Sequence, residues 1–198
     1  MLFIGRINVQ NAYLTKKDTC MESIRLLFSE VTVNDLENIH RLYSAPEVDK
    51  YNTLGIPKDI EDTKNLIRRM VGSQKATPRN SHNWTLTNKE TNEFIGMAGL
   101  ALSNNIFKLG EIYFEIMPHF WGNGYATEVA NKLIIFGFDK FKLHKIEAGV
   151  ATENVASIRV LEKVGMQREG MRRKLLPIRG EWKDSYHYAI VEDDSRSN

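Results

Sequence analysis

Cysteine is nearly absent from this chain of 198 residues, in which Cys20 is the single one. One cysteine cannot form an intrachain disulfide, and it cannot build a cysteine-rich zinc site. A reducing compartment suits such a chain, so we expect a cytoplasmic location. The 5 histidines show no metal-ligand spacing, and we expect no bound metal.

Long apolar runs and an excess of one charge are also missing. No run approaches the ~20 apolar residues that a membrane-spanning helix needs, and residues 2–4 are too few for the apolar region of a secretory signal. We therefore expect no membrane partner. The 27 Lys and Arg residues against 25 Asp and Glu residues leave a net charge of +2. Dedicated nucleic-acid binders normally have a strong basic excess, so we expect no direct nucleic-acid binding.

The remaining composition suits one folded domain. Hydrophobic residues make up 42% of the 198 residues, enough for a core and the usual length of a single domain. Residues 1–20 lack sustained periodicity, so we expect a flexible N-terminal extension there. The domain should cover residues 21–192, and residues 193–198 should form a polar tail.

Hydrophobic spacing predicts a mixed α/β domain without internal repeats. Asp59 and the pair Thr32 and Asp35 are typical of helix starts, Gly72 of a helix end, and Asn154 of another start. The expected order is βααβββαβαββ. Helices are expected at about 33–44, 59–72, 126–138 and from Asn154 to about 165, and strands near 23–28, 84–87, 94–102, 110–117, 145–150, 168–176 and 182–191.

The strand expected at 110–117 has two chemically different faces, because successive side chains point to opposite sides. One face carries Glu111, Tyr113 and Glu115. The other face is apolar and carries Ile112, Phe114 and Ile116.

A glycine-containing turn follows this strand, in Met117-Pro-His-Phe-Trp-Gly-Asn-Gly-Tyr-Ala-Thr-Glu128. Gly122 and Gly124 permit close backbone approach, and free N–H groups at a helix start favour an anion such as a pyrophosphate. No Gly-Lys-Ser/Thr ending is present, and Thr127 stands where a dinucleotide fingerprint needs a small residue. Nucleotide hydrolysis and hydride transfer are thereby excluded. A plain strand-to-helix turn explains the two glycines equally well.

A second segment, Ala151-Thr-Glu-Asn-Val-Ala-Ser-Ile-Arg-Val-Leu-Glu-Lys-Val-Gly-Met166, lies one strand later. Together the two segments resemble the acetyl-CoA-dependent N-acetyltransferases of the GNAT superfamily, and most of all its RimJ/RimL-like branch, the ribosomal-protein N-acetyltransferases. Further matches are the Glu22–Phe28 opening, Phe94-Ile-Gly-Met-Ala-Gly-Leu100 and Glu111–Ile116. The resemblance covers about residues 21–192.

The resemblance implies a GNAT-like fold: a central, mostly antiparallel sheet whose fourth and fifth strands splay apart, flanked by helices. It also implies acetyl-CoA as the cosubstrate, without a metal. The pyrophosphate would bind the backbone amides of the 121–126 turn, and the pantetheine would lie between the strand ending near Met117 and the strand at 146–150. The residues implied to contact the cofactor are Ile116, Met117, Trp121, Gly122, Asn123, Gly124, Tyr125, Ala126, Asn154 and Ser157.

The resemblance assigns two catalytic residues. Glu111 matches a strand acid often assigned as the general base, acting directly or through water; Glu115 or a water chain is the alternative. A backbone N–H near Met117 would donate to the thioester oxygen. Leu161 stands where many members carry the tyrosine that protonates the leaving thiolate, which leaves Ser157 as the candidate acid.

A second departure from the family pattern is His119, which occupies a position where Gln or Arg is usual. We expect a modest effect, because the backbone does most of the phosphate binding. The expected function is acetyl transfer to a primary amine of a protein N-terminus, possibly ribosomal, or of a small molecule. The alternative, kept open by Leu161, is a catalytically degenerate acetyl-CoA-binding sensor or scaffold.

The final hairpin carries the remaining local features. Its basic side chains favour an exposed hairpin, with an edge that binds an acidic acceptor as the alternative; they are Arg168, Arg172, Arg173, Lys174 and Arg179. Three aromatic residues alternate on one strand face and are expected to pack in the core or in a homodimer contact; they are Trp182, Tyr186 and Tyr188.

Overall fold

The computed structural model describes residues 21–103 and 106–194. The predicted extension, residues 1–20, and residues 195–198 of the predicted tail lie outside the described residues. The described elements are β1 (Met21–Glu22), β2 (Leu26–Glu30), η1 (Val33–Asp35), α1 (Leu36–Tyr43), α2 (Pro46–Asp49), α3 (Ile60–Ser73), β3 (Ser81–Asn88), β4 (Phe94–Leu102), β5 (Leu109–Ile116), η2 (Pro118–Phe120), α4 (Tyr125–Phe141), β6 (Lys145–Ala151), α5 (Val155–Lys163), β7 (Gln167–Ile178) and β8 (Glu181–Val191). Among these residues, no helix has the length and apolarity to cross a membrane.

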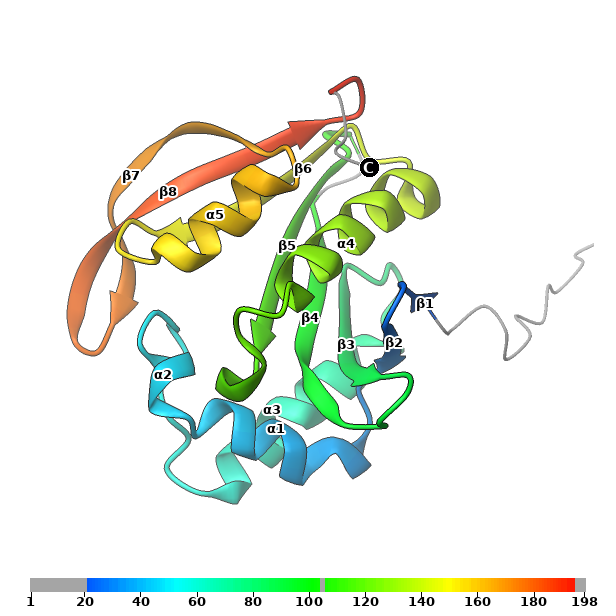
Figure 1. The fold of residues 1–198 in the computed structure, drawn as a ribbon, viewed down its shortest axis with the longest axis vertical. Helices are drawn as coiled ribbons and strands as arrows, with labels where there is room; N and C mark the ends of the chain where they lie inside the picture. The colour runs from blue at the N-terminus through cyan, green and yellow to red at the C-terminus, as the bar shows by residue number, and fades with distance from the viewer. Residues whose placement is uncertain (1–20, 104–105, 195–198) are drawn as a thin grey trace, which may run out of the picture.

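The strands form one 8-stranded sheet in the order β1-β2-β3-β4-β5-β6-β8-β7 (Figure 1). Neighbouring strands are antiparallel except β5 and β6, which run parallel. Helices flank this sheet, so the predicted fold class is confirmed.

The two faces of the sheet carry separate cores. On one face α4 and α5 bury Val129 and Leu161 against a cluster that includes Ile112 of β5. On the other face α1 and α3 bury residues such as Ile39 against Met97 of β4. The alternation predicted for β5 is therefore confirmed, because its apolar side chains face α4 while Glu111, Tyr113 and Glu115 face the opposite side.

Local signals placed most helix starts correctly. Thr32 and Asp35 form the predicted capping box, but it caps η1, and α1 follows at Leu36. Asp59 caps α3 as predicted. Gly72 is wrong as the helix end, because α3 continues through Ser73. The four-residue helix α2, with Pro46 at its first position, was not predicted.

Two glycines in β4 set how closely β4 approaches β5. A Cβ on Gly96 would collide with the backbone carbonyl oxygen of Glu115, and a Cβ on Gly99 would collide with the ring of Tyr113. The Phe94–Leu100 segment therefore contains glycine at these positions for a steric reason. Because they lack a Cβ, Gly96 and Gly99 leave room for the Glu115 backbone and the Tyr113 ring.

Candidate functional site

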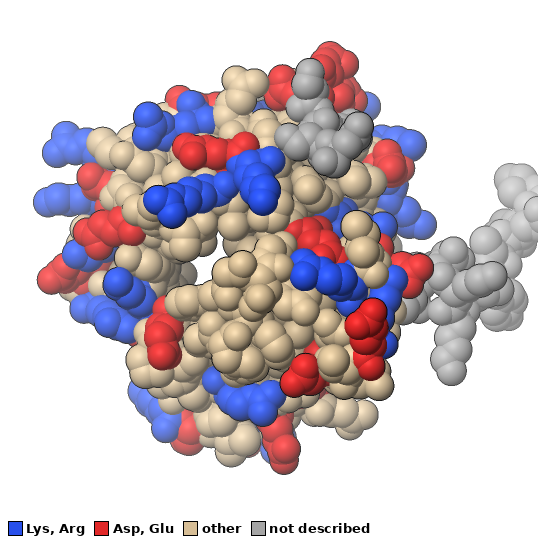
Figure 2. Space-filling view, in the orientation of Figure 1, with Lys and Arg blue, Asp and Glu red and all other residues tan. Residues whose placement is uncertain are grey.

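The site begins where β5 and β6 separate. The two strands pair through Leu109↔Lys145, Gly110↔Ile146 and Glu111↔Glu147, and no further. Beyond Glu147, β6 stays paired with β8, while β5 stays paired with β4 to Ile116. The strands therefore splay, as the resemblance implies. Figure 2 shows an opening in the surface between α5 and the first turn of α4, at this place in the fold.

The predicted anion-binding turn lies at the open end of the splay. Gly122 and Gly124 have left-handed φ angles of 78° and 80°, which side chains disfavour. The backbone N–H of Trp121 donates to Pro118, and its indole Nε1 donates to the carbonyl oxygen of Ile116 at 2.7 Å. The turn is thus held in shape by its own residues.

The backbone N–H groups of this turn have no protein acceptor. Within the described part of the chain, none is bonded at Gly122, Asn123, Gly124, Tyr125 or Ala126. The N–H groups of a first helical turn have no intrahelical acceptor, and the helix dipole makes that end positive. The arrangement suits a pyrophosphate.

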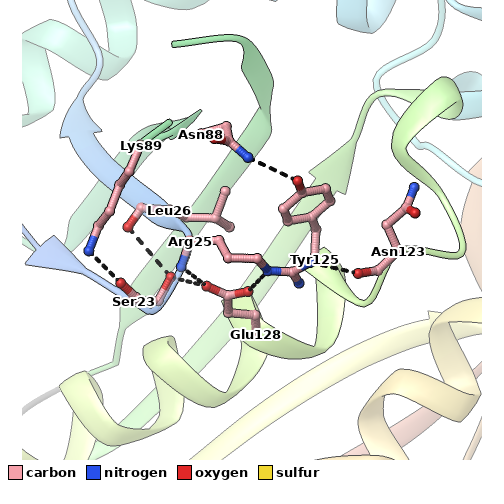
Figure 3. Close-up of polar contacts among 8 residues, drawn as sticks. All are labelled: Ser23, Arg25, Leu26, Asn88, Lys89, Asn123, Tyr125 and Glu128. Atoms are coloured by element: carbon pink, nitrogen blue, oxygen red, sulfur yellow. Dashed lines mark hydrogen bonds and ion pairs between the residues drawn. The ribbon is translucent and has the colours of Figure 1, made fainter. Parts of the chain in front are cut away.

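Arg25, which lies between β1 and β2, contacts both the glycine-containing turn and the first turn of α4 (Figure 3). Its Nε donates to Glu128 at 2.7 Å, and its Nη1 donates to the carbonyl oxygen of Asn123 at 3.0 Å. Its guanidinium also lies over the Tyr125 ring, 4.2 Å from the centroid. The ring hydroxyl accepts from Asn88 at 3.0 Å, which ties the same turn to β3.

Glu128 is the acidic centre of this network. One of its carboxylate oxygens accepts 2.7 Å hydrogen bonds from the Ser23 hydroxyl and from the Arg25 backbone N–H. Burial acts to raise the pKa of Glu128, but the hydrogen bonds from Ser23 and Arg25 outweigh it and lower the pKa. The carboxylate is therefore ionised at neutral pH and holds Arg25 beside the turn.

The second segment expected to contact the cofactor contains the start of α5. Asn154 caps this helix as predicted, because its Oδ1 accepts from the Ser157 N–H at 3.1 Å. The Ser157 hydroxyl makes no hydrogen bond within the described residues, so it is free to donate. Leu161 is buried in the core under α5 and offers no proton.

The opposite face of β5 places the two candidate carboxylates in different surroundings. Glu111 is exposed, and its Oε1 lies 3.7 Å from where a Cβ on Gly149 would stand. Glu115 lies deeper, and its Oε1 accepts from the Asn52 amide at 2.8 Å. Its Oε2 is buried and has no hydrogen-bond partner. Burial raises the pKa of Glu115 to about 7, although hydrogen bonding by Tyr43 and Asn52 acts to lower it.

Residues 46–52, which include α2 and Asn52, are called the α2 segment below. Two contacts join this segment to the connection between β6 and α5 and to the β7–β8 hairpin. The Tyr51 hydroxyl donates to the carbonyl oxygen of Glu153 at 3.0 Å, just before α5. Arg179, at the tip of the β7–β8 hairpin, pairs with the buried Asp49 at 2.9 Å. The α2 segment thus spans the splay on the side opposite α4.

The expected donor to the thioester oxygen, a backbone N–H near Met117, is not the N–H of Met117 itself. The backbone N–H of Met117 donates to the carbonyl oxygen of Ile95 at 2.9 Å. It is part of the link between β4 and β5, so it is not free to bind a thioester oxygen. Any such donor must come from a neighbouring position.

The final hairpin separates the aromatic residues expected to pack together. Tyr188 is buried, but Trp182 is 63% exposed, so core packing is wrong for Trp182 and the alternative, a homodimer contact, stays a prediction. Most of β7 is exposed, as the basic residues favoured. Arg168 lies over the Tyr186 ring, 4.6 Å from its centroid.

One cluster among the described residues brings three possible metal ligands together, namely Glu147, Glu169 and His187. The Lys145 ammonium lies 2.7 Å from Glu169 and 3.6 Å from Glu147. An ion-pair network explains the cluster.

Sequence reasoning missed Arg25, Tyr43 and Asn52. Arg25 lies in a segment that matched the family, but no local pattern pairs it with Glu128, which is 103 residues away along the chain. Asn52 lies in a loop without any local pattern, and only the fold brings it to Glu115.

Comparisons with known proteins agree on one family. A profile for an acetyltransferase (GNAT) domain matches residues 25–167. YoaA of Bacillus subtilis, named as an uncharacterized N-acetyltransferase, is 33% identical over 172 residues, which cover 87% of this chain and 96% of that protein.

Two solved structures are similar in fold. The spermidine N-acetyltransferase of Vibrio cholerae, in complex with CoA and spermine, superposes with a TM-score of 0.75 at 22% identity, over 86% of this chain and 97% of that one. The ribosomal-protein-S5-alanine acetyltransferase of Vibrio fischeri superposes with a TM-score of 0.75 at 20% identity, over 88% and 97%.

Proposed function

The chain belongs to the acetyltransferase (GNAT) family, and from that premise we propose that it transfers the acetyl group of acetyl-CoA to a primary amine by direct attack in a ternary complex. One observation carries the proposal. Five consecutive backbone N–H groups, from Gly122 to Ala126, are unbonded at the start of α4, beside the place where β5 and β6 separate.

The residues of the turn fit the pyrophosphate of CoA. The free N–H groups and the positive end of α4 supply donors without the desolvation of a buried side chain. The side chains of Trp121, Asn123 and Tyr125 shape the turn instead: the Asn123 amide, for example, donates to the carbonyl oxygen of Phe120 at 3.1 Å. Binding is therefore proposed to fall mainly to the backbone, and we expect His119, in place of Gln or Arg, to have a modest effect.

The pantetheine is proposed to run through the splay, past Ile116 and Met117 on β5 and past the start of α5. Asn154 and Ser157 face this path from the far side. The free Ser157 hydroxyl is then the proton donor to the leaving thiolate that Leu161 cannot be. Acetyl-CoA, when bound, supplies the thioester that the amine attacks.

The acceptor is proposed to be a primary amine of the kinds named for the similar structures: a polyamine, or the N-terminal amine of a ribosomal protein. The RimJ/RimL-like motifs in the sequence favour the N-terminal amine. A polyamine is the second candidate, because two carboxylates, the half-buried Glu115 and the exposed Glu111, lie on the face of β5 away from α4, from which an acceptor is proposed to come.

The test is acetyl transfer by the full chain, followed by mass spectrometry, with spermidine and with peptides that begin with Ala or Ser. We expect calorimetric binding of CoA and acetylation of at least one acceptor. CoA binding without transfer to any of them would contradict the proposed enzyme and favour a cofactor-binding module. Absence of CoA binding would contradict the cofactor site as well.

A further inference from the structure

We propose that Glu115, rather than Glu111, binds the ammonium group of the acceptor and takes its proton. The proposal rests on the proposed function and assigns one residue to one step of it. It follows from where Glu115 lies, what surrounds its two oxygens, and how the α2 segment closes over it.

Glu115 lies beyond the closed end of the splay. The last residue of β5 that pairs with β6 is Glu111, and Glu115 is four residues further on, about 13 Å along a strand at roughly 3.3 Å per residue. Both side chains lie on the face away from α4. A cofactor whose pyrophosphate lies at the start of α4 reaches this face only through the splay, so an amine attacking from the opposite side meets the thioester here.

The side chains around Glu115 leave one of its two carboxylate oxygens without a hydrogen-bond partner. Oε1 accepts a hydrogen bond from Asn52, and the Tyr43 side chain on α1 also hydrogen-bonds to the carboxyl. Oε2 is buried and has no hydrogen-bond partner among the described residues. Buried polar atoms are normally paired, and an unpaired one at a site calls for a donor. A primary ammonium is a donor of the complementary charge.

Glu111 has no such enclosed surroundings. Its side chain is exposed at the end where β5 and β6 still pair, so water competes for any ammonium it meets. The difference in enclosure, on the same face of the same strand, favours Glu115.

The protonation state of Glu115 suits a base that works near neutral pH. Its pKa of about 7 is set first by burial, against the hydrogen bonds from Tyr43 and Asn52. The titratable groups that face it are Tyr43 on α1 and Tyr113 on β5, and burial raises the pKa of both, so both stay neutral. Of these three groups, only Glu115 therefore carries a charge near neutral pH.

The step balances as follows. The Glu115 carboxylate takes one proton from the ammonium, and the neutral amine nitrogen forms a bond to the thioester carbon. As the carbon–sulfur bond breaks, the Ser157 hydroxyl gives its proton to the sulfur and takes up the second amine proton, which leaves free CoA thiol and the amide. Glu115 then releases its proton to solvent.

The experiment compares Glu115→Gln with the matched variant Glu111→Gln, using spermidine and the Ala- and Ser-initiated peptides at pH 6–9. We expect kcat/KM of Glu115→Gln to fall at least about 100-fold, the lower range for a lost general base, with unchanged CoA affinity by calorimetry. In the wild type, kcat/KM should rise through a step near pH 7 that Glu115→Gln lacks. Glu111→Gln should lose much less of kcat/KM than Glu115→Gln does. Near-wild-type rates for Glu115→Gln, or a larger loss for Glu111→Gln, would overturn the proposal.

A second readout works even if the variant does not fold or no acceptor is acetylated. Wild-type protein labelled with ¹³C in the Glu carboxyl groups should show one resonance titrating near pH 7, and spermidine should shift it. A resonance unmoved by spermidine and by both peptides overturns the Glu115 site. A wild type that binds CoA but transfers to no acceptor refutes the proposed function separately.

Discussion

The two sides of the splay differ in the chemical groups that they present. On the α4 side, the proposed cofactor turn presents backbone N–H groups, and the side chains around it, Arg25 and Glu128 above all, hold the turn in shape (Figure 3). On the α1 side, the proposed acceptor site presents side chains, Glu115, Asn52 and Tyr43, from three separate segments. A backbone site needs a particular local conformation, whereas a side-chain site needs distant segments brought together.

The largest expected effect is at Gly96, because both sides depend on the close approach of β4 and β5. Gly96→Ala places a Cβ against the Glu115 carbonyl, a rigid backbone atom, and we expect a loss of about 3 kcal/mol or more in unfolding free energy. The matched control is Gly170→Ala in β7, where a Cβ meets nothing within 4 Å. Urea unfolding of both variants is the measurement, and equal stabilities would contradict the steric account.

A pH-dependent effect distinguishes the acceptor side. The folded pKa of Glu115, about 7, lies above the ordinary value of 4.5, so its contribution to stability is fully present below about pH 4.5 and is lost as the pH rises through 7. Glu115→Gln avoids the buried charge. We expect it to be more stable than wild type at pH 8.5 by on the order of 2 kcal/mol, with the gap closing by pH 5.

Urea unfolding at the two pH values measures this gap. The exposed Glu111 supplies the control, since Glu111→Gln should show no comparable difference between pH 5 and pH 8.5. A constant gap across pH would mean that packing or a hydrogen bond, not ionisation, sets the effect at Glu115.

On the cofactor side, Gly124→Val should weaken CoA binding at least tenfold, about 1.4 kcal/mol. The substitution strains a left-handed residue at 80° and crowds the free amides. Gly180→Val imposes the same strain, at 79°, in the distant hairpin with open space around it. Calorimetry with CoA should find full affinity for the hairpin variant. An unchanged affinity in folded Gly124→Val would remove the turn from the site.

The smallest effect is expected at the start of α5. Asn154→Ala loses the cap to the Ser157 N–H and should cost about 1 kcal/mol of stability whatever the side chain does for the cofactor. Acetyl-CoA kinetics at a temperature where the variant is fully folded measure what the Asn154 side chain contributes to cofactor binding. A raised KM for acetyl-CoA is expected, and wild-type kinetics would leave Asn154 as a cap alone.

Local patterns in the sequence were enough to predict the mixed α/β order, the caps at Asp59 and Asn154, the alternating faces of β5 and the turn around Gly122 and Gly124. Each of these depends on residues within a few positions of one another. The end of α3 and the presence of α2 were not predicted, because Gly72 is tolerated inside a helix that packs on the sheet, and α2 is too short for periodicity.

The tertiary structure alone decided which carboxylate is enclosed. Glu111 and Glu115 are indistinguishable by alternation, since both point to the same face. Pairing with β6 leaves the first exposed, and the α2 segment, joined across the splay by Tyr51 and Arg179, encloses the second. Desolvation and an unmatched oxygen are properties of contacts between segments more than 60 residues apart, as the Asn52–Glu115 bond shows, and no local pattern encodes them.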